Sequence, residues 1–386
     1  MVASPPPSIR PDSPELADQA GEWRSAYVHI PFCARICPYC DFAVVEGRQD
    51  LVDRYVSALV SEISMSVDWD TLDAVFIGGG TPSQVAPMLI GEILESLNDK
   101  FGLVDGVEVS MEANPEDITA RSSRGYRAAG VNRLSMGVQS FDDVVLTALG
   151  RQHTGGQALR AIEDARSVFE RLSIDLMYGD PTETEASWDR TLDSALAAGA
   201  DHISAYSLTV ELGTPLSRAV AAGAPAPDDD VQADRWERAA ERLSERLIRY
   251  EVSNYATDAP CKYNLATWAQ GEYVAFGLGA HGHRNGIRTR NLRRLDRYIE
   301  TVEAGQRPIA GETVGSGWDR ELERLMLGLR RTAGVVAGAA GQKLLEDHPE
   351  FVDAGIIEQR EGRIVVVKPL LTDTVIREVL AVPPQE

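Results

Sequence analysis

Three of the four cysteines in this 386-residue sequence lie in one short stretch. Cys33, Cys37 and Cys40 form the pattern Cys-x-x-x-Cys-x-x-Cys, directly after an alternating apolar run that predicts a short strand. Thiolates at this spacing on a tight loop can converge on the corners of an iron–sulfur cube, because soft sulfur ligands suit iron–sulfur chemistry. Only three corners of such a cube would be covered. The pattern therefore predicts a cluster with one open iron that can bind a small chelating ligand.

Zinc and a disulfide are the alternatives for these cysteines. Structural zinc takes four ligands, and His29 or Asp41 would complete the set, but the chain lacks the two paired-cysteine knuckles typical of such sites. A disulfide needs an oxidising compartment and leaves one cysteine of the loop unpaired. The spacing favours the cluster over both alternatives and over plain core cysteines.

The elements that must position this loop follow a regular alternation. Short β-branched runs predict strands, and the longer amphipathic runs between them predict helices. Six strands joined by helices imply an α/β fold with a parallel sheet and right-handed crossovers, and we expect an open, partial (β/α)6 barrel. The expected strands are 26–30, 72–77, 107–111, 133–138, 172–177 and 202–206, and the expected helices are 51–67, 85–101, 119–129, 156–171 and 186–198.

Polar and glycine-rich residues stand at the carboxyl ends of these strands, where chemistry is expected in a barrel. An acid, an amide, a base and a second acid facing one cavity could bind an amino acid head group, ribose hydroxyls and adenine. Glycines there allow backbone amides to approach a ligand closely, although a lone glycine triplet is more often only a turn. Each polar residue taken singly is more typical of a helix cap or a surface ion pair. The residues in question are Gly79, Gly80, Thr81, Glu112, Gln139, Arg151 and Asp175.

Composition limits the class of protein and its partners. The formal net charge of −21 repels phosphate backbones and anionic lipid surfaces, so nucleic acid is not an expected partner. No apolar run reaches transmembrane length, and the start lacks the basic and apolar blocks of a signal peptide, so we expect a cytoplasmic protein. The proline-rich residues 1–22 predict a disordered tail.

The expected domain organisation places the barrel at 23–255, an extension at 256–310 and a small C-terminal domain at 311–386. In the last part, helical runs surround a hairpin at 356–367 that turns at Glu361 and Gly362. This arrangement resembles a winged-helix domain. A winged helix does not by itself imply DNA binding, and the acidic balance argues against it.

Several motifs resemble one family. The stretches 27–42, 77–82, 112–115, 130–141, 149–153 and 202–215 look like the radical S-adenosylmethionine (SAM) family of oxygen-independent coproporphyrinogen III oxidases and their haem-chaperone relatives. The resemblance is strong over about residues 27–282 and weak beyond. It implies that Cys33, Cys37 and Cys40 ligate a [4Fe-4S] cluster whose open iron binds SAM. It further implies that SAM is contacted by Tyr27, Tyr39, Gly79, Gly80, Thr81, Glu112, Gln139, Arg151 and Asp175.

One position separates the two branches of this family. The oxidases resemble one another in having a further cysteine two residues after the third, whereas this chain has Phe42 there. That feature favours a haem chaperone, which would bind the cluster, SAM and haem and pass haem to an acceptor protein. The alternative is a radical SAM oxidoreductase that reduces SAM to a 5′-deoxyadenosyl radical and acts on coproporphyrinogen III or a related tetrapyrrole. The sequence leaves a homodimer open.

The segment 261–268 departs from the family. In the chaperones it resembles His-Asn-x-x-Tyr-Trp and is implicated in haem binding, but here Tyr263 stands in place of the histidine and Thr267 in place of the tyrosine. A deprotonated tyrosine can bind ferric haem. The resemblance therefore leaves Tyr263 as a candidate haem ligand, with a purely structural segment as the alternative. Farther on, His281 in a glycine-rich loop is more typical of a loop histidine than of a ligand.

Overall fold

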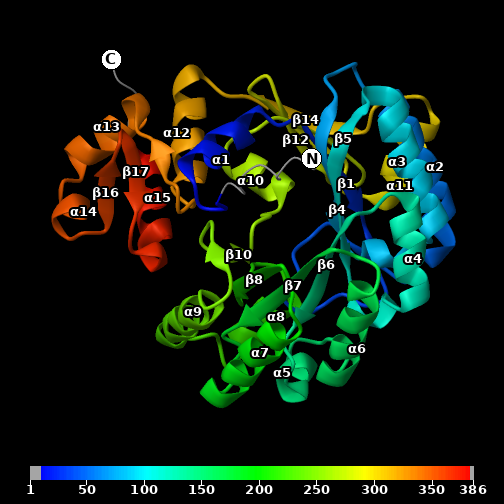
Figure 1. Cartoon of the computed structure of the whole chain (residues 1–386). Coiled ribbons are helices and arrows are strands. Elements are labelled where there is room, and N and C mark those ends of the chain that lie inside the picture. The colour runs from blue at the N-terminus through cyan, green and yellow to red at the C-terminus, as the bar shows by residue number, and fades with distance from the viewer. Residues whose placement is uncertain (1–9, 383–386) are drawn as a thin grey trace, which may run out of the picture.

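The computed structural model describes residues 10–382, and its main element is a curved sheet of twelve strands (Figure 1). The sheet order is β14-β13-β12-β11-β1-β4-β5-β6-β7-β8-β10-β9. Six central strands are parallel neighbours, which confirms the expected (β/α)6 arrangement. Their bounds are β1 Ser25–Ile30, β4 Leu72–Gly79, β5 Leu103–Ala113, β6 Arg133–Gln139, β7 Arg171–Tyr178 and β8 His202–Ser207.

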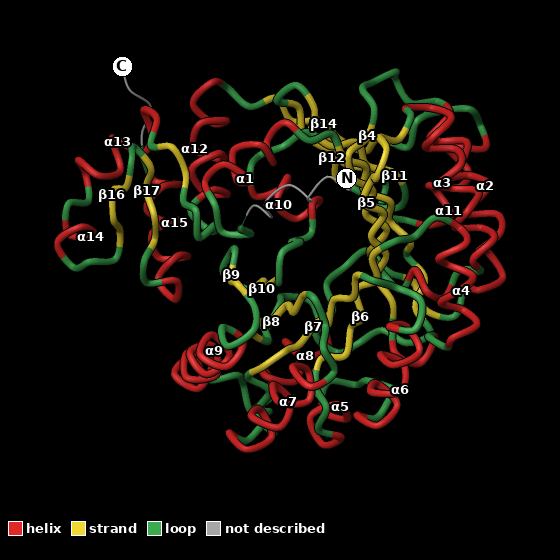
Figure 2. Tube along the Cα trace, viewed as in Figure 1, coloured by secondary structure: helices red, strands yellow, loops and turns green. Residues whose placement is uncertain are grey.

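Helices cover the outer face of this sheet, as Figure 2 shows. In α3, Ile90, Ile93, Leu94 and Leu97 recur at helical spacing and are buried, so one apolar stripe packs on the strands. No helix between residues 10 and 382 is long and apolar enough to cross a membrane. The helices between the central strands are α2 Val52–Ser64, α3 Pro87–Phe101, α4 Ala120–Ala129, α5 Asp143–Ala148, α6 Gly155–Arg166 and α7 Glu185–Ala197.

Both edges of the parallel sheet are extended. β11 pairs with β1 in parallel, and β12, β13 and β14 continue from it as an antiparallel meander. On the other edge β10 and β9 add antiparallel strands after β8. The expected domain limits at 255 and 310 fall inside β10 and β14. The added strands are β9 Ile248–Arg249, β10 Asn254–Ala256, β11 Tyr273–Phe276, β12 His281–Arg284, β13 Ile287–Asn291 and β14 Ile309–Val314.

The C-terminal part has a hydrophobic core of its own, which includes Leu325, Leu344 and Ile364. The expected hairpin forms, and its turn residues Glu361 and Gly362 have φ angles of 50° and 78°, as a tight hairpin turn requires. Figure 1 shows this part beside the barrel. Its elements are α12 Gly317–Gly328, β15 Val335–Val336, α13 Gly338–Asp347, α14 Glu350–Asp353, β16 Ile357–Arg360, β17 Arg363–Val366 and α15 Thr372–Ala381.

The expected disorder of the N-terminal segment is wrong for residues 14–22, while residues 1–9 lie outside the described part of the chain. Residues 14–22 form α1 (Pro14–Gln19) and a short 3-10 helix, Ala20–Glu22. Proline at the first position and the Ser13 side chain at the cap start the helix. The C-terminal part holds it, because Arg331 donates to the Ala17 carbonyl at 2.7 Å and Arg363 pairs with Asp18 at 2.8 Å. Pro14 therefore marks the start of a helix and not a disordered segment.

A buried carboxylate joins the extension to the barrel. Glu62 of α2 accepts hydrogen bonds from the Gly277 N–H at 2.8 Å, from Asn291 Nδ2 at 2.6 Å and from the Tyr298 hydroxyl at 2.5 Å. Tyr298 belongs to α11 (Leu295–Glu303), which packs against α2. Burial raises the pKa of Glu62 to about 7, although the three donors favour its ionised form.

We expect Glu62→Ala to lower the free energy of unfolding by roughly 2–4 kcal/mol, because three buried donors lose their acceptor. Because the pKa of this carboxyl is higher in the folded state than in the unfolded state, its contribution to the stability of the folded protein decreases as the pH rises from 4.5 to about 7. The cost of the substitution should therefore be larger near pH 6 than near pH 8. Denaturant unfolding at the two pH values measures both effects. Glu303→Ala, which removes an exposed ion pair with Arg54, is the control and should change little.

Candidate functional site

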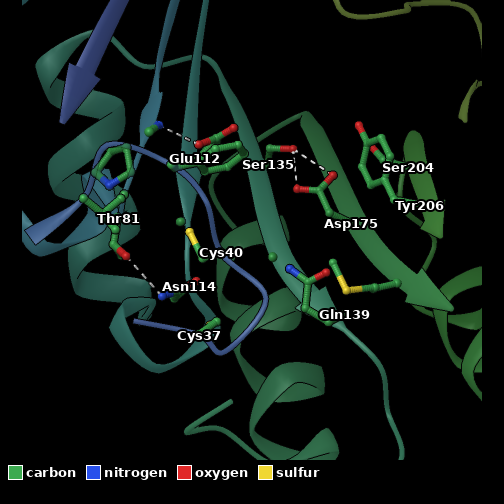
Figure 3. Close-up of a pocket in the computed structure, with 18 of the residues that line it drawn as sticks. Cys37, Cys40, Thr81, Glu112, Asn114, Ser135, Gln139, Asp175, Ser204 and Tyr206 are labelled. Carbon is green, nitrogen blue, oxygen red and sulfur yellow. Dashed lines mark hydrogen bonds between the residues drawn. The ribbon is translucent and has the colours of Figure 1, made fainter. Parts of the chain in front are cut away.

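A cavity of about 520 Å³ lies at the carboxyl ends of the central strands, and we call it the main cavity. This volume is typical of small-molecule sites. In Figure 3 the cysteine loop lies on one side and Asp175, Ser204 and Tyr206 lie on the other. Of the residues predicted from the sequence, the main cavity is lined by Cys33, Cys37, Tyr39, Cys40, Gly79, Gly80, Thr81, Glu112, Gln139, Arg151 and Asp175.

The cysteine loop is closed at its base. β2 (Phe32–Cys33) pairs with β3 (Val45–Glu46), and the Glu46 carboxylate accepts the Ile36 N–H at 2.9 Å, so both ends of the loop are held together. Donors approach two of the sulfurs. Thr81 Oγ1 lies 3.5 Å from Cys33 Sγ, and a guanidinium nitrogen of Arg151 lies 3.6 Å from Cys37 Sγ. Burial raises the pKa of Cys33 to about 11, while the Thr81 hydroxyl and the charge of Arg151 act in the opposite direction, toward the thiolate that iron requires.

The arrangement fits a cluster better than a single zinc ion. No three His, Cys, Asp or Glu side chains between residues 10 and 382 are placed to hold one metal ion. His29, the candidate fourth ligand, faces the Ala43 carbonyl at 2.9 Å with one ring nitrogen and the Tyr27 hydroxyl at 3.1 Å with the other. The ligand atoms of an iron–sulfur cube lie farther apart than the ligand atoms of a single metal ion. The buried Nε of Arg151 also has no partner within the described chain, as expected beside a site made for a ligand.

The glycine triplet after β4 brings two backbone segments together. Gly79 has a φ of 117°, which favours glycine, and the Gly80 N–H donates to the Ile30 carbonyl at 2.7 Å. A Cβ on Gly80 would lie 2.8 Å from the Pro31 carbonyl. The triplet thus lets the end of β4 pack directly on the start of the cysteine loop, which positions Thr81 beside Cys33.

Two half-buried acids face the main cavity. Glu112 accepts the Gly79 N–H at 3.0 Å, and Asp175 accepts the Ser135 hydroxyl at 3.1 Å. Burial and the nearby charge of Asp175 raise the pKa of Glu112 to about 7. Burial also raises the pKa of Asp175, against the lowering effect of donors that include Ser204. A cationic group bound between the acids would favour their ionised forms, and SAM carries such groups.

Gln139 ends β6 in a strained conformation. Its φ is 68°, in the left-handed region that favours glycine, and the pairing of β6 with β7 shifts register between Gly137 and Gln139. Such strain is characteristic of functional sites. Asn114 lies nearby and accepts from Arg151 at 2.6 Å.

Sequence reasoning missed some residues of the main cavity, among them Ser135, Ser204 and Tyr206. The signal that would have found Ser135 is strand alternation, because residues 133, 135 and 137 of β6 all line the cavity. Ser204 pairs in register with Asp175 on the neighbouring strand, which only the sheet order shows.

Tyr27 is the one predicted residue that lies elsewhere. Its ring lines a second cavity of about 390 Å³ behind the cysteine loop, together with Tyr263 and Tyr273. Tyr263 stacks on Tyr27 and on Phe76, with ring centroids 6.0 Å and 5.0 Å apart. Burial raises the pKa of the Tyr263 hydroxyl well above its usual value, so the phenolate needed for iron ligation is disfavoured.

The barrel and its three-cysteine loop define a radical SAM protein, and the family model described as the Radical SAM superfamily matches residues 27–195. This class implies a [4Fe-4S] cluster and SAM, which the cysteines and acids of the main cavity fit. A relative from Mycobacterium tuberculosis strain H37Rv, named heme chaperone HemW, is 36% identical over 380 residues, covering 95% of this chain and 97% of the relative. The protein of the same name from Bacillus subtilis strain 168 is 35% identical over 320 residues, with 81% and 84% covered. The chain belongs to the HemW family.

A solved structure has the same fold. The coproporphyrinogen III oxidase HemN from Escherichia coli, described as a radical SAM enzyme, superimposes with a TM-score of 0.79 over 95% of this chain and 92% of that chain. The two sequences are 22% identical, so the likeness concerns the fold alone.

Proposed function

We propose that this protein is a haem chaperone, which binds haem and passes it to an acceptor protein while holding a [4Fe-4S] cluster and SAM. The observation that carries the proposal is Phe42 in the cysteine loop, at the position where the oxidases have a further cysteine. Its side chain is 65% exposed and borders both the main cavity and the second cavity. The relatives named heme chaperone HemW, which align with most of the chain, support the same function.

The residues of the main cavity have distinct tasks in this proposal. Cys33, Cys37 and Cys40 hold the cluster, which supplies an open iron for chelation when bound. Thr81 and Arg151 donate to the sulfurs and stabilise their thiolate forms.

The other polar side chains of the main cavity hold SAM. Glu112 and Asp175 receive positive charge, and the hydroxyls of Ser135 and Ser204 orient Asp175. Gln139 adds an amide, since it lines the same cavity.

The test uses one anaerobic preparation of the full chain with its cluster reconstituted and SAM added. We expect haem titration to give a saturable change in the haem absorption band, and the bound haem to move to a haem-free globin offered as acceptor. We expect no decarboxylation of coproporphyrinogen III in the same preparation. Turnover of coproporphyrinogen would support the oxidoreductase alternative instead, and failure to bind haem would overturn the chaperone function.

A further inference from the structure

The second cavity contains the features that a haem site needs. It lies behind the cysteine loop, between β1 and the strands β11 and β12. Phe42, Tyr263 and Glu112 line both cavities and so separate the second cavity from the main cavity. Aromatic rings form much of its wall, whereas His281 and Arg293 line it on the side of the extension. It therefore offers an apolar surface and a nitrogen ligand in one place.

His281 differs from the other histidines of the chain. Five of the six histidines have ring nitrogens hydrogen-bonded to other groups, as with His153 and Glu116 or His202 and Tyr250. The ring of His281 makes no hydrogen bond within residues 10–382, and its side chain is exposed at the start of β12. Partial burial and nearby arginines lower the pKa of His281, so the ring is neutral near pH 7 and has a lone pair for a metal.

The surroundings of His281 are positive although the whole chain carries a net charge of −21. Arg288, Arg290 and Arg293 all lie close enough to lower its pKa. Arg288 pairs with Glu323 at 2.8 Å, but the exposed Arg290 and Arg293 make no ion pair in the described part of the chain. Arg293 donates to the Asp41 carbonyl at 3.4 Å, so among the described residues its charge still lacks a carboxylate partner. Two such guanidinium groups beside an exposed ligand suit a molecule with carboxylates at its edge.

We propose that the second cavity and its rim bind haem, with His281 as the axial ligand of the iron and Arg290 and Arg293 paired with the propionates. This inference rests on the proposed function and names its ligand site. Phe42 and Tyr273 pack against the porphyrin, which gives the exposed ring of Phe42 a partner. The cavity is open, so part of the haem stays accessible, as transfer to an acceptor requires. Tyr263 then serves as an aromatic wall.

The first test removes the ligand and restores it from solution. In the full chain with cluster and SAM bound, we expect His281→Ala to weaken haem binding by roughly tenfold or more and to lose the absorption band of nitrogen ligation. Added imidazole should restore that band by entering the space left by the ring. His348→Ala, on the surface of the C-terminal part, should bind as the wild type does.

The outcomes separate the inference from the proposed function. If the wild type binds haem and His281→Ala binds it with the same affinity and spectrum, the site is wrong and the chaperone function stands. If the wild type binds no haem, both are wrong. Cluster content measured on each variant shows that the barrel is intact.

The second test concerns the propionates. Arg293→Ala should weaken binding of haem more than binding of its dimethyl ester, which lacks the negative charges. Arg294→Ala is the matched control, because Arg294 is exposed and already pairs with Asp296 at 2.8 Å. It should affect neither ligand. An equal effect of Arg293→Ala on haem and ester would overturn the propionate pairing.

Discussion

Cys37→Ala is expected to abolish the iron–sulfur cluster. The three thiolates lie on one closed loop and bind three of the four irons of the cube, so one iron has no protein ligand in the wild type. The variant would leave a second iron without a protein ligand. Anaerobic reconstitution followed by iron and sulfide analysis measures the loss, and we expect one [4Fe-4S] cluster per wild-type chain and none in the variant. A full cluster in the variant would contradict the assignment.

Cys261→Ala is the matched control for this experiment. Cys261 is buried just before α10 (Lys262–Trp268) and is not part of the cysteine loop. We expect this variant to keep the whole cluster. Loss of the cluster in both variants would instead indicate that the fold, rather than ligation, had been disturbed.

Glu112→Gln is expected to weaken SAM binding by roughly 10- to 100-fold, because it removes a charge that receives a cation but keeps an oxygen for the Gly79 N–H. SAM is titrated against the spectrum of the reduced cluster. Glu116→Gln is the control, since Glu116 pairs with His153 outside the main cavity. An unchanged SAM affinity in Glu112→Gln would exclude this acid from the site.

The same carboxyl predicts a pH dependence. Burial first, then the charge of Asp175, raises the pKa of Glu112 to about 7, while the Gly79 N–H and Arg133 act in the opposite direction. Glu112 must lose its proton to receive a cation, so SAM affinity in the wild type should increase as the pH rises through about 7. Glu112→Gln should lose that part of the dependence. A wild-type affinity that falls over the same range would contradict the role of Glu112.

The local pattern of apolar residues was sufficient to predict much of the fold. The strand Arg133–Gln139 and the helix Pro87–Phe101 lie within two residues of their expected limits, because apolar residues at period 2 or 3.6 must face a core wherever the chain goes. The expectation that polar residues at the carboxyl ends of the strands face one cavity was also correct for Thr81, Glu112 and Asp175, since parallel strands end at the same edge of the sheet.

The errors arose where distant contacts decide the structure. Residues 14–22 are helical because Arg331 and Arg363, more than 300 residues away, bind Ala17 and Asp18. Strands β11 to β14 were not predicted as part of the large sheet, because their pairing depends on the free edge of β1.

The chemistry of the cysteine loop follows from the sequence alone, since three thiols at that spacing must lie on one turn of chain whatever surrounds them. The sequence also indicated parallel strands joined by helices through right-handed crossovers. Folding in three dimensions was needed to show that Tyr27 and Tyr263 line a second cavity and that His281 lies on its rim beside arginines. These positions come from residues up to about 250 apart in the sequence, and burial and neighbouring charge, which set the protonation of such groups, exist only once the chain has folded.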